Sequence, residues 1–216
     1  MFDQLTYDWH GKTVILIAGG PSLRDFDFAH ITPLLRRGAI SVAVNDSLVK
    51  CHWADVVITI DSIWIGKRSQ LLRKFTGEKI LCVDETRAKF QSGIRYIRRD
   101  SSSRLSDNMG VICTGGNSGF AALGMAMMRG AGTEGGKILM LGYDMNGPGH
   151  FHDGYEWKSR YGAKDYPRWA RGFGSLALEA TDLGIRVINC NSKSAIRCFP
   201  FGKIVRGEVK TMELVQ

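Results

Sequence analysis

The sequence lacks paired cysteines, long apolar runs, internal repeats and low-complexity tracts. Its five cysteines are widely spaced and form no CxxC pair, which argues against a zinc site, a redox motif or a disulfide framework. No apolar stretch reaches the roughly 18 to 20 residues of a membrane span, and Asp3 and Asp8 stand where a signal peptide would be basic. We therefore expect reduced core thiols, a cytoplasmic location and no membrane partner.

Acidic residues are fewer than basic ones, and the 216 residues carry a formal net charge of +8 at pH 7. A positive surface favours an anionic partner such as a nucleotide, a phosphorylated metabolite or nucleic acid, but it can equally serve solubility alone. Basic and aromatic residues alternate between positions 155 and 171, a pattern that can hold a phosphate and stack a base. The same pattern also fits a solvated, partly ordered loop, and both interpretations stay open.

Short β-branched runs alternate with helix-like segments along the chain, which is typical of parallel βαβ units. Near-continuous apolar runs indicate strands that helices bury on both faces. We expect one nucleotide-binding α/β domain over residues 1–216, Rossmann-like, with a mainly parallel sheet and helices on both faces. The expected strands are Thr13–Ala18, Ala39–Val44, Asp55–Ile60, Lys79–Val83, Lys137–Leu141 and Ile185–Asn189, with an irregular or edge strand at Ile94–Arg98; the expected helices are a buried one at Phe120–Arg129 and one at Trp169–Leu183.

Residues 146–167 have no apolar periodicity, and a loop of this length inside a compact domain is usually functional or mobile. We predict a lid-like insertion there, with Tyr155, Arg160 and Lys164 as candidates to contact a ligand. The segment from Lys203 onward is weakly patterned and is expected to form a C-terminal arm.

Small polar residues follow most of the expected strands. Each alone says little, because Asn, Asp and Ser are common in turns and helix caps. In an open parallel sheet, however, ligands bind outside the carboxyl ends of the strands, where side chains and helix N-termini converge. The pattern therefore predicts a site at this edge, formed by the strand ends Gly19 to Ser22, Asn45 to Ser47, Asp61 and Ser62, Asp144, and Asn191 and Ser192.

Two glycine-rich turns raise the question of phosphate binding. The stretch VILIAGGPSL, from Val14 to Leu23, lacks the Gly-Lys-Ser/Thr of a P-loop and the spacing of GxGxxG. Its glycines permit a close approach to a ligand, but a sharp strand-to-helix corner also needs them. The stretch TGGNS, from Thr114 to Ser118, precedes the buried helix, whose N-terminus would either hold an anion or be closed by a capping turn.

Five segments stand in the same order and spacing as in a known superfamily: VILIAGGPSLRDFDF, ISVAVND, ADVVITID, TGGNSGFAALGMAMMRGA with KILMLGYDM, and ALEATDLGIRVINCNSKS. Together they cover most of the chain from Thr13 to Ser194. The chain resembles the Rossmann-like group that joins the bacterial sialyltransferases, which act from CMP-sialic acid, to the 6-hydroxymethyl-dihydropterin diphosphokinase-like proteins, including short phage versions.

The resemblance implies that the Gly-Pro-Ser turn lies under the nucleotide phosphates, and that the Asn after the second strand and the TGGNS segment face the nucleotide. The sialyltransferases have Gly-Asn-Gly-Pro-Ser where this chain has Ala18-Gly19-Gly20-Pro21-Ser22, so a cytidine preference does not follow. The predicted nucleotide-binding residues are Gly19, Gly20, Pro21, Ser22, Asn45, Asp61, Thr114, Gly115, Gly116, Asn117, Ser118 and Asn191.

The catalytic base of the sialyltransferases is a His that follows the strand matching KILML, where this chain has His150 and His152. Imidazole, with an ordinary pKa of about 6.5, suits a base that deprotonates an acceptor hydroxyl. We predict an inverting glycosyltransferase that uses a nucleotide-sugar donor and modifies phage or cellular nucleic acid or a glycan. Its catalytic candidates are His150, His152 and Asp144, and Tyr155, Tyr161, Arg160 and Lys164 are candidates to stabilise the leaving group.

Two other functions stay open. A diphosphokinase-like enzyme would hold Mg²⁺ with Asp61 or Asp144, which would make Asp144 essential and the histidines secondary. His150, His152 and Asp153 could also ligate a divalent ion, although we assign no resident metal. A catalytically silent accessory protein would instead keep the nucleotide or nucleic-acid site without the reaction.

Overall fold

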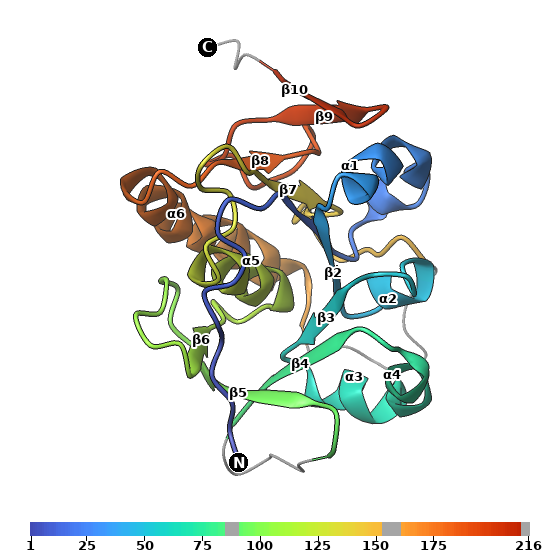
Figure 1. Ribbon diagram of the computed structural model, residues 1–216, viewed down its shortest axis with the longest axis vertical. Coiled ribbons are helices and arrows are strands. Elements are labelled where there is room, and N and C mark those ends of the chain that lie inside the picture. The colour runs from blue at the N-terminus through green and yellow to red at the C-terminus, as the bar shows by residue number, and fades with distance from the viewer. Residues whose placement is uncertain (85–90, 153–160, 213–216) are drawn as a thin grey trace.

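The computed structural model describes residues 1–84, 91–152 and 161–212 (Figure 1). Within them, eight strands form one sheet in the order β6-β5-β4-β3-β2-β1-β7-β8, and all neighbouring strands pair in parallel. This is the Rossmann-like α/β fold that the alternating apolar runs predicted. The strands are β1 (Val14–Ile17), β2 (Ile40–Val44), β3 (Val56–Thr59), β4 (Glu78–Val83), β5 (Arg95–Asp100), β6 (Val111–Cys113), β7 (Ile138–Leu141) and β8 (Val187–Asn189).

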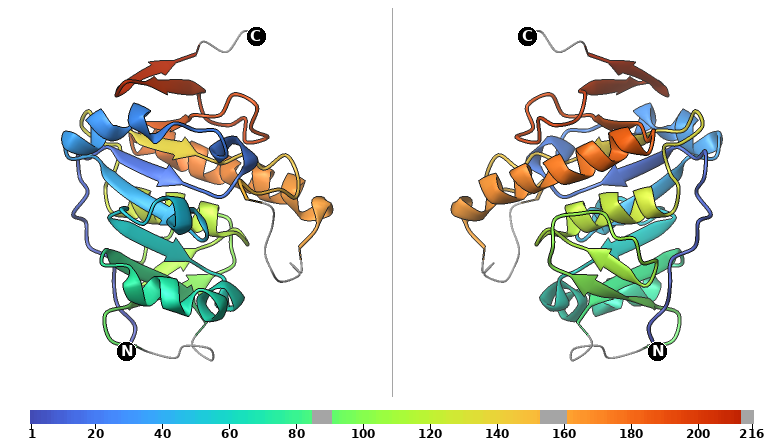
Figure 2. Two further views of the ribbon diagram at one scale, coloured as in Figure 1. Left: turned by 90° about the vertical axis from the view of Figure 1, so that its right-hand side faces the viewer. Right: turned by 90° about the vertical axis from the view of Figure 1, so that its left-hand side faces the viewer.

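Helices cover both faces of the sheet, as Figures 1 and 2 show. Successive side chains of β1 point to opposite faces of the sheet: Val14 and Leu16 belong to one buried cluster, and Ile15 and Ile17 belong to the other. The first cluster includes residues of α5 (Ser118–Met128) and α6 (Tyr166–Asp182). The second includes residues of α1 (Thr32–Arg36), α2 (Ser47–Lys50), α3 (Ser62–Lys67) and α4 (Ser69–Lys74).

The helix α5 is buried along its whole length, because every residue from Ser118 to Met128 is buried. A run rich in Ala, Leu and Met with no polar face fits such a position, and the sequence predicted a buried helix here. Its N-terminus lies directly after the short strand β6 and reaches the carboxyl edge of the sheet. The Asn117 side chain caps it, since its Oδ1 accepts the N–H of Phe120 at 2.8 Å.

The strand β5 departs from the expectation for Ile94–Arg98, because it lies inside the sheet between β4 and β6. A strand with three arginines can occupy this place because carboxylates of neighbouring segments pair with two of them and the third, Arg98, lies over the Phe2 ring. Arg95 bonds Glu78, and Arg99 bonds Asp84 through two nitrogens at 2.8 and 2.6 Å. The true edge strand is β6, whose three residues are too few to be recognised by an apolar pattern.

The segment expected as a C-terminal arm from 203 forms, with Gly202, an antiparallel hairpin of β9 (Gly202–Val205) and β10 (Glu208–Thr211). It lies at the top of Figure 1, and Arg37 anchors it by donating to the carbonyl of Gly207 at 2.7 Å. Among the cysteines, Cys51, Cys82 and Cys113 are buried, whereas Cys198 is exposed, so the expectation of core thiols was wrong there. None of the helices within the described residues is long and apolar enough to span a membrane.

A buried hydroxyl joins the carboxyl ends of β1 and β2. Ser47, which is fully buried at the start of α2, donates to the carbonyl of Ile17 at 2.6 Å and accepts the N–H of Val44 at 2.8 Å. These backbone groups lie where both strands leave the sheet, so they need side-chain partners. Ser47 thereby fixes the spacing of the turns that follow β1 and β2.

Replacing Ser47 with Ala should lower the free energy of unfolding by about 1–3 kcal/mol, because the buried Ile17 and Val44 groups each lose a partner. Urea unfolding measures this change. Thr181→Ala is the matched control, since its exposed hydroxyl also donates to a backbone carbonyl, that of Ala177 at 2.9 Å. It should change stability by less than about 0.5 kcal/mol. Equal losses in both variants would contradict the role given to Ser47.

Candidate active site

A cavity of about 680 Å³ opens at the carboxyl ends of the strands. The arrowheads of the sheet in Figure 2 point to this side of the molecule, where α6 also begins. Segments that follow β1, β2, β3, β6 and β7 all contribute to its lining. The lining brings together these predicted residues: Gly19, Gly20, Pro21, Asn45, Asp61, Thr114, Gly116, Asn117, Ser118, Asp144, His150 and Tyr161.

Other predicted site residues lie elsewhere. Ser22, Gly115, Asn191, His152 and Lys164 are not among the residues that line the cavity. Lys164 is exposed in the short helix η4 (Ala163–Asp165), and Asn191 closes its own turn by accepting the N–H of Lys193 at 3.0 Å. Tyr155, Arg160 and Asp153 lie outside the described residues. Of the segment predicted as a lid, residues 146–152 and 161–167 are described.

The first glycine-rich turn is closed by a carboxylate of the protein itself. Asp144, after β7, accepts the N–H of Ser22 at 3.0 Å and its hydroxyl at 2.7 Å. The N–H of Gly20 donates to the carbonyl of Gly142 at 2.8 Å. The amides of Gly20 and Ser22, which the resemblance placed under phosphates, therefore bond within the protein, and Ser22 holds Asp144 in place.

Several cavity-lining side chains have buried polar atoms with no hydrogen-bond partner among the described residues: Oδ1 of Asn45, Nδ2 of Asn117 and Nε1 of Trp169. Buried polar atoms are rarely left unpaired, because their desolvation costs free energy. Asn45 also has a φ of 53°, a left-handed conformation that Asn tolerates better than most residues. Three residues that line the cavity thus have one acceptor and two donors that no described group pairs with.

The cavity lining is acidic within a basic protein. Its carboxylates are each bound by groups of the protein: Asp61 caps α3, Asp84 binds Arg99, Asp100 accepts the N–H of Ser102, and Asp144 binds Ser22. Arg99 is the one Lys or Arg among the described lining residues. The Asp84 carboxylate raises the pKa of the Arg99 guanidinium, so Arg99 stays charged.

The segment after β7 brings His150 into the cavity, and its imidazole hydrogen-bonds the backbone of Gly19. Burial lowers the pKa of His150 below its ordinary value, and the neighbouring His152 lowers it further, while the Gly19 bond and the Asp46 carboxylate oppose them. The rings of His150 and His152 stack at 5.2 Å with an interplanar angle of 5°. His150 therefore faces the ligand space as a neutral imidazole at neutral pH.

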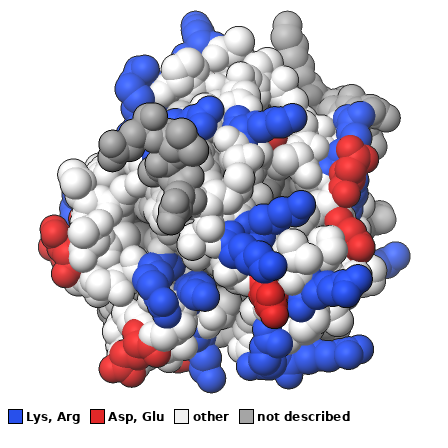
Figure 3. All heavy atoms as spheres, turned by 90° about the horizontal axis from the view of Figure 1, so that it is seen from above, with Lys and Arg blue, Asp and Glu red and all other residues white. Residues whose placement is uncertain are grey.

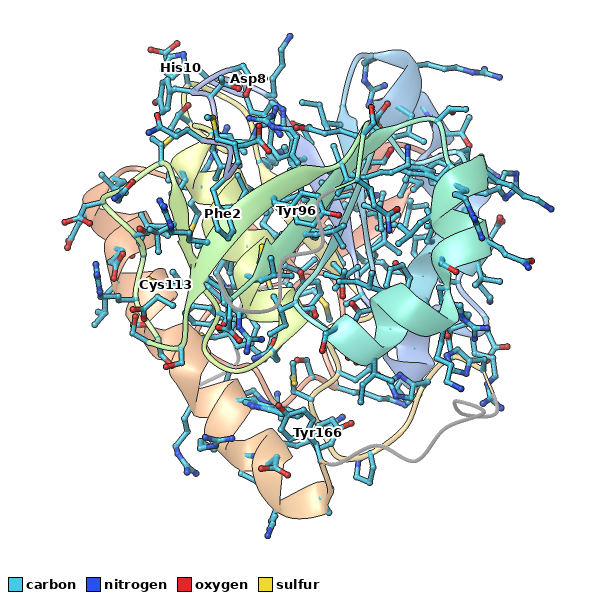
Figure 4. All side chains as sticks on the ribbon, turned by 90° about the horizontal axis from the view of Figure 1, so that it is seen from below. Phe2, Asp8, His10, Tyr96, Cys113 and Tyr166 are labelled. Carbon is cyan, nitrogen blue, oxygen red and sulfur yellow. The ribbon has the colours of Figure 1, made fainter. Side chains whose placement is uncertain are left out.

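Sequence reasoning did not assign four of the residues that shape this site. Tyr166 and Trp169, on the first turns of α6, line the cavity; Figure 4 shows Tyr166 at this end of the helix. Both belong to the basic and aromatic cluster noted in the sequence, which was the available signal. Arg99 belongs to a cluster of arginines around residues 95–104 in the sequence, but its partner Asp84 gave no signal, because their pairing joins the end of β4 to β5. Among the described residues no group of three His, Cys, Asp or Glu side chains could hold a metal ion.

Fold and site together define an α/β protein of the Rossmann-like class with a polar cavity at the carboxyl edge of its sheet. The sequence matches no protein-family model and no curated protein. Its fold is similar to that of the MAf glycosyltransferase from Magnetospirillum magneticum AMB-1, with a TM-score of 0.57 and 13% sequence identity. The likeness covers 88% of this chain and 33% of that protein, so the chain spans about a third of the length of its structural neighbour.

Replacing Gly20 with Ala should destabilise the protein by about 1–3 kcal/mol, because the new Cβ would overlap the Asp144 carboxylate and the Gly142 carbonyl. Chemical unfolding measures the loss. Gly66→Ala in α3 is the matched control, since no atom lies within 4 Å of its added Cβ. That variant should be neutral or up to about 1 kcal/mol more stable. A Gly20→Ala protein as stable as the wild type would refute the closed geometry of this turn.

Proposed function

We propose that the chain is an inverting glycosyltransferase that uses a nucleotide-sugar donor, similar to the bacterial sialyltransferases. The observation that carries this proposal is His150, a half-buried imidazole on the cavity wall whose pKa lies below its ordinary value. An imidazole that stays neutral at neutral pH can accept a proton, which is what a general base must do. The fold-level likeness to a glycosyltransferase supports the class of reaction.

We assign different roles to the two ring nitrogens of His150. A neutral imidazole carries one N–H, and because the Gly19 backbone raises the pKa of His150, the Gly19 carbonyl is the group that would accept that N–H. The lone pair then resides on the other nitrogen, which is the tautomer needed to take a proton from an acceptor hydroxyl. The same carbonyl accepts the N–H of Phe151 at 3.1 Å, which ties the His150 backbone to the first turn.

In the proposed step, the acceptor oxygen attacks the anomeric carbon of the donor from the face opposite the phosphate. The new carbon–oxygen bond forms while the bond to the phosphate oxygen breaks, and that electron pair leaves with the nucleotide. The acceptor proton passes to His150. Each bond made is matched by one broken, and because the attack comes from the face opposite the leaving phosphate, the configuration at the anomeric carbon inverts.

The unpartnered polar atoms supply the donor site. Nδ2 of Asn117 and Nε1 of Trp169 can donate to phosphate or sugar oxygens, and Oδ1 of Asn45 can accept from a hydroxyl or amino group. These groups are neutral. They act beside the positive charge of Arg99, which is already paired with Asp84. Leaving-group charge would therefore be stabilised chiefly by hydrogen bonds in a partly enclosed site.

The surface charge supports an anionic acceptor. Lys and Arg side chains are spread over much of the face viewed from above in Figure 3, and the whole chain carries a net charge of +8. Nucleic acid, which we propose beside glycans as an acceptor, would be attracted to such a surface.

Nucleotide binding should raise the melting temperature, because a ligand that binds only the folded state stabilises it by mass action. Thermal-shift measurements with CMP, CDP, UDP, GDP, ADP and ATP, each with and without Mg²⁺, should show a metal-independent rise with a nucleoside mono- or diphosphate. Stabilisation by ATP with Mg²⁺ alone would contradict the glycosyltransferase proposal and favour the diphosphokinase. A protein that none of these nucleotides stabilises would contradict both.

Asn117→Ser should weaken that binding while it leaves the fold intact. The serine oxygen can still cap α5, but the Nδ2 donor is lost, so the stabilising shift should shrink or vanish. Asn191→Ser is the matched control, since its Nδ2 is also buried and unpartnered but lies outside the cavity lining. Equal effects of both substitutions on the nucleotide-induced shift would argue against a donor site at Asn117.

His150→Ala should remove turnover and keep nucleotide affinity, because a general base contributes about 10²–10⁴-fold to the rate and little to ground-state binding. Release of nucleotide from the corresponding nucleotide-sugar measures turnover. His10→Ala, at a histidine paired with Glu134, is the control and should leave turnover unchanged. Full activity in the His150 variant would show that another group is the base.

A further inference from the structure

The buried carboxylate of Asp46, behind the cavity wall, accepts hydrogen bonds on both of its oxygens. Asp46 lies after β2 and is 2% exposed. One of its oxygens accepts the indole N–H of Trp64 at 2.6 Å and Nε of Arg68 at 2.9 Å. The other accepts Nη2 of Arg68 at 3.0 Å. Burying a charge without partners is costly, and this two-pronged pairing with Arg68 offsets that cost.

The same carboxylate also faces an imidazole. Nε2 of His152 lies 3.4 Å from Oδ2 of Asp46, on the oxygen that Nη2 of Arg68 also contacts. His152 is not part of the cavity lining, but its ring stacks parallel on that of His150, which is. Asp46, His152 and His150 thus form a continuous row that leads from the buried end of β2 to the cavity.

This row restrains the ring of His150 from behind. A parallel ring at 5.2 Å limits rotation of the His150 imidazole, and the Asp46 carboxylate flanks that neighbouring ring, 3.4 Å from its Nε2. The alternation of His150 and His152 with Phe151, whose side chain is buried in the core, is what places both rings on one side of the segment.

We propose that Asp46 and His152 are positioning residues that hold the His150 imidazole in the orientation and charge state of a general base. This inference rests on the proposed function and assigns the two histidines different roles. His150 alone exchanges a proton with the acceptor, whereas His152 and Asp46 exchange none. Asp46 favours the imidazolium that forms as the acceptor loses its proton, because a carboxylate stabilises a nearby positive charge.

Other charged groups lie near the segment that carries His150 and His152. Arg24 donates to the carbonyls of Phe151 and His150 at 3.2 and 3.5 Å, and Lys50 lies 5.3 Å from the centre of the Phe151 ring. Asp144 lines the same cavity and is bound by Ser22. The test substitutions leave all of these residues in place.

The test is an NMR titration of the ¹⁵N-labelled imidazole of His150 in the whole protein, from about pH 5 to about pH 8, with no ligand added. Asp46→Asn removes a charge that raises the pKa of His150, so this pKa should fall. His152→Gln removes a ring that lowers the pKa of His150, so this pKa should rise. A fall of the His150 pKa in Asp46→Asn and a rise in His152→Gln would support the arrangement of the three residues, since a general loss of structure would not shift the pKa in opposite directions.

Arg68→Lys is the control, because it breaks the two-pronged anchor but keeps the Asp46 carboxylate and a positive charge. Its melting temperature should fall, while the pKa of His150 should stay within about 0.2 pH unit of the wild type. If Asp46→Asn fails to fold, the rise expected in His152→Gln still decides the matter.

Unchanged titration of His150 in both Asp46→Asn and His152→Gln, or shifts in the same direction, would overturn the proposal. The outcome is independent of the nucleotide measurements, because the titration needs no donor. If no nucleotide binds but the opposite shifts appear, the row exists and the proposed function fails. If a nucleotide binds but the shifts are absent, the function stands and the positioning role fails.

Discussion

The parallel direction of all eight strands is the constraint on which the site depends. It brings every strand's carboxyl end to one edge, where backbone groups leave the ladder and need partners. Much of the polar chemistry at this edge therefore serves the protein itself. Ser47 closes the ends of β1 and β2, Asp61 caps α3, and Ser22 binds Asp144. What remains for a ligand is a smaller set of cavity-lining groups: the buried polar atoms of Asn45, Asn117 and Trp169 that have no described partner, and the His150 imidazole on the cavity wall.

The polar groups that bond within the protein include all the carboxylates of the described lining, which explains how an acidic cavity lining occurs in a protein with a basic surface. The described lining has four carboxylates and one guanidinium, yet each carboxylate is bound by a backbone N–H, a hydroxyl or Arg99. The proposed chemistry follows from that arrangement: neutral donors and a neutral imidazole face the ligand, while the basic residues lie over the outer surface (Figure 3).

The sequence was sufficient to predict the fold class, the strands β1 to β4, and the buried helix α5, because each has a run of apolar residues with a clear boundary. It predicted β5 as an irregular or edge strand, whereas β5 lies inside the sheet, since the salt bridges that let Arg95 and Arg99 lie there come from residues 17 and 15 positions away. The three residues of β6 gave no pattern at all. Polar strand ends predicted the edge that carries the cavity, which needs only the direction of the strands.

The roles of individual side chains were harder to predict, because they depend on contacts between distant segments. Ser22 was expected at a phosphate, but Asp144, 122 residues later, takes its N–H and hydroxyl. The sequence placed Asp46 among the polar strand ends of the predicted site without a role of its own, and its contact with His152 arises when the segment after β7 folds against the end of β2. No spacing rule links those positions.

The most direct test of the account is a crystal structure of the protein with CMP, or with whichever nucleoside phosphate stabilises it most. The account predicts electron density for the nucleotide inside the cavity, with hydrogen bonds to Asn45 and Asn117 and with its phosphate on the side of His150 and Trp169. Nucleotide density on the outer basic surface, with the cavity holding only solvent, would contradict the central claim that this edge of the sheet is a donor site.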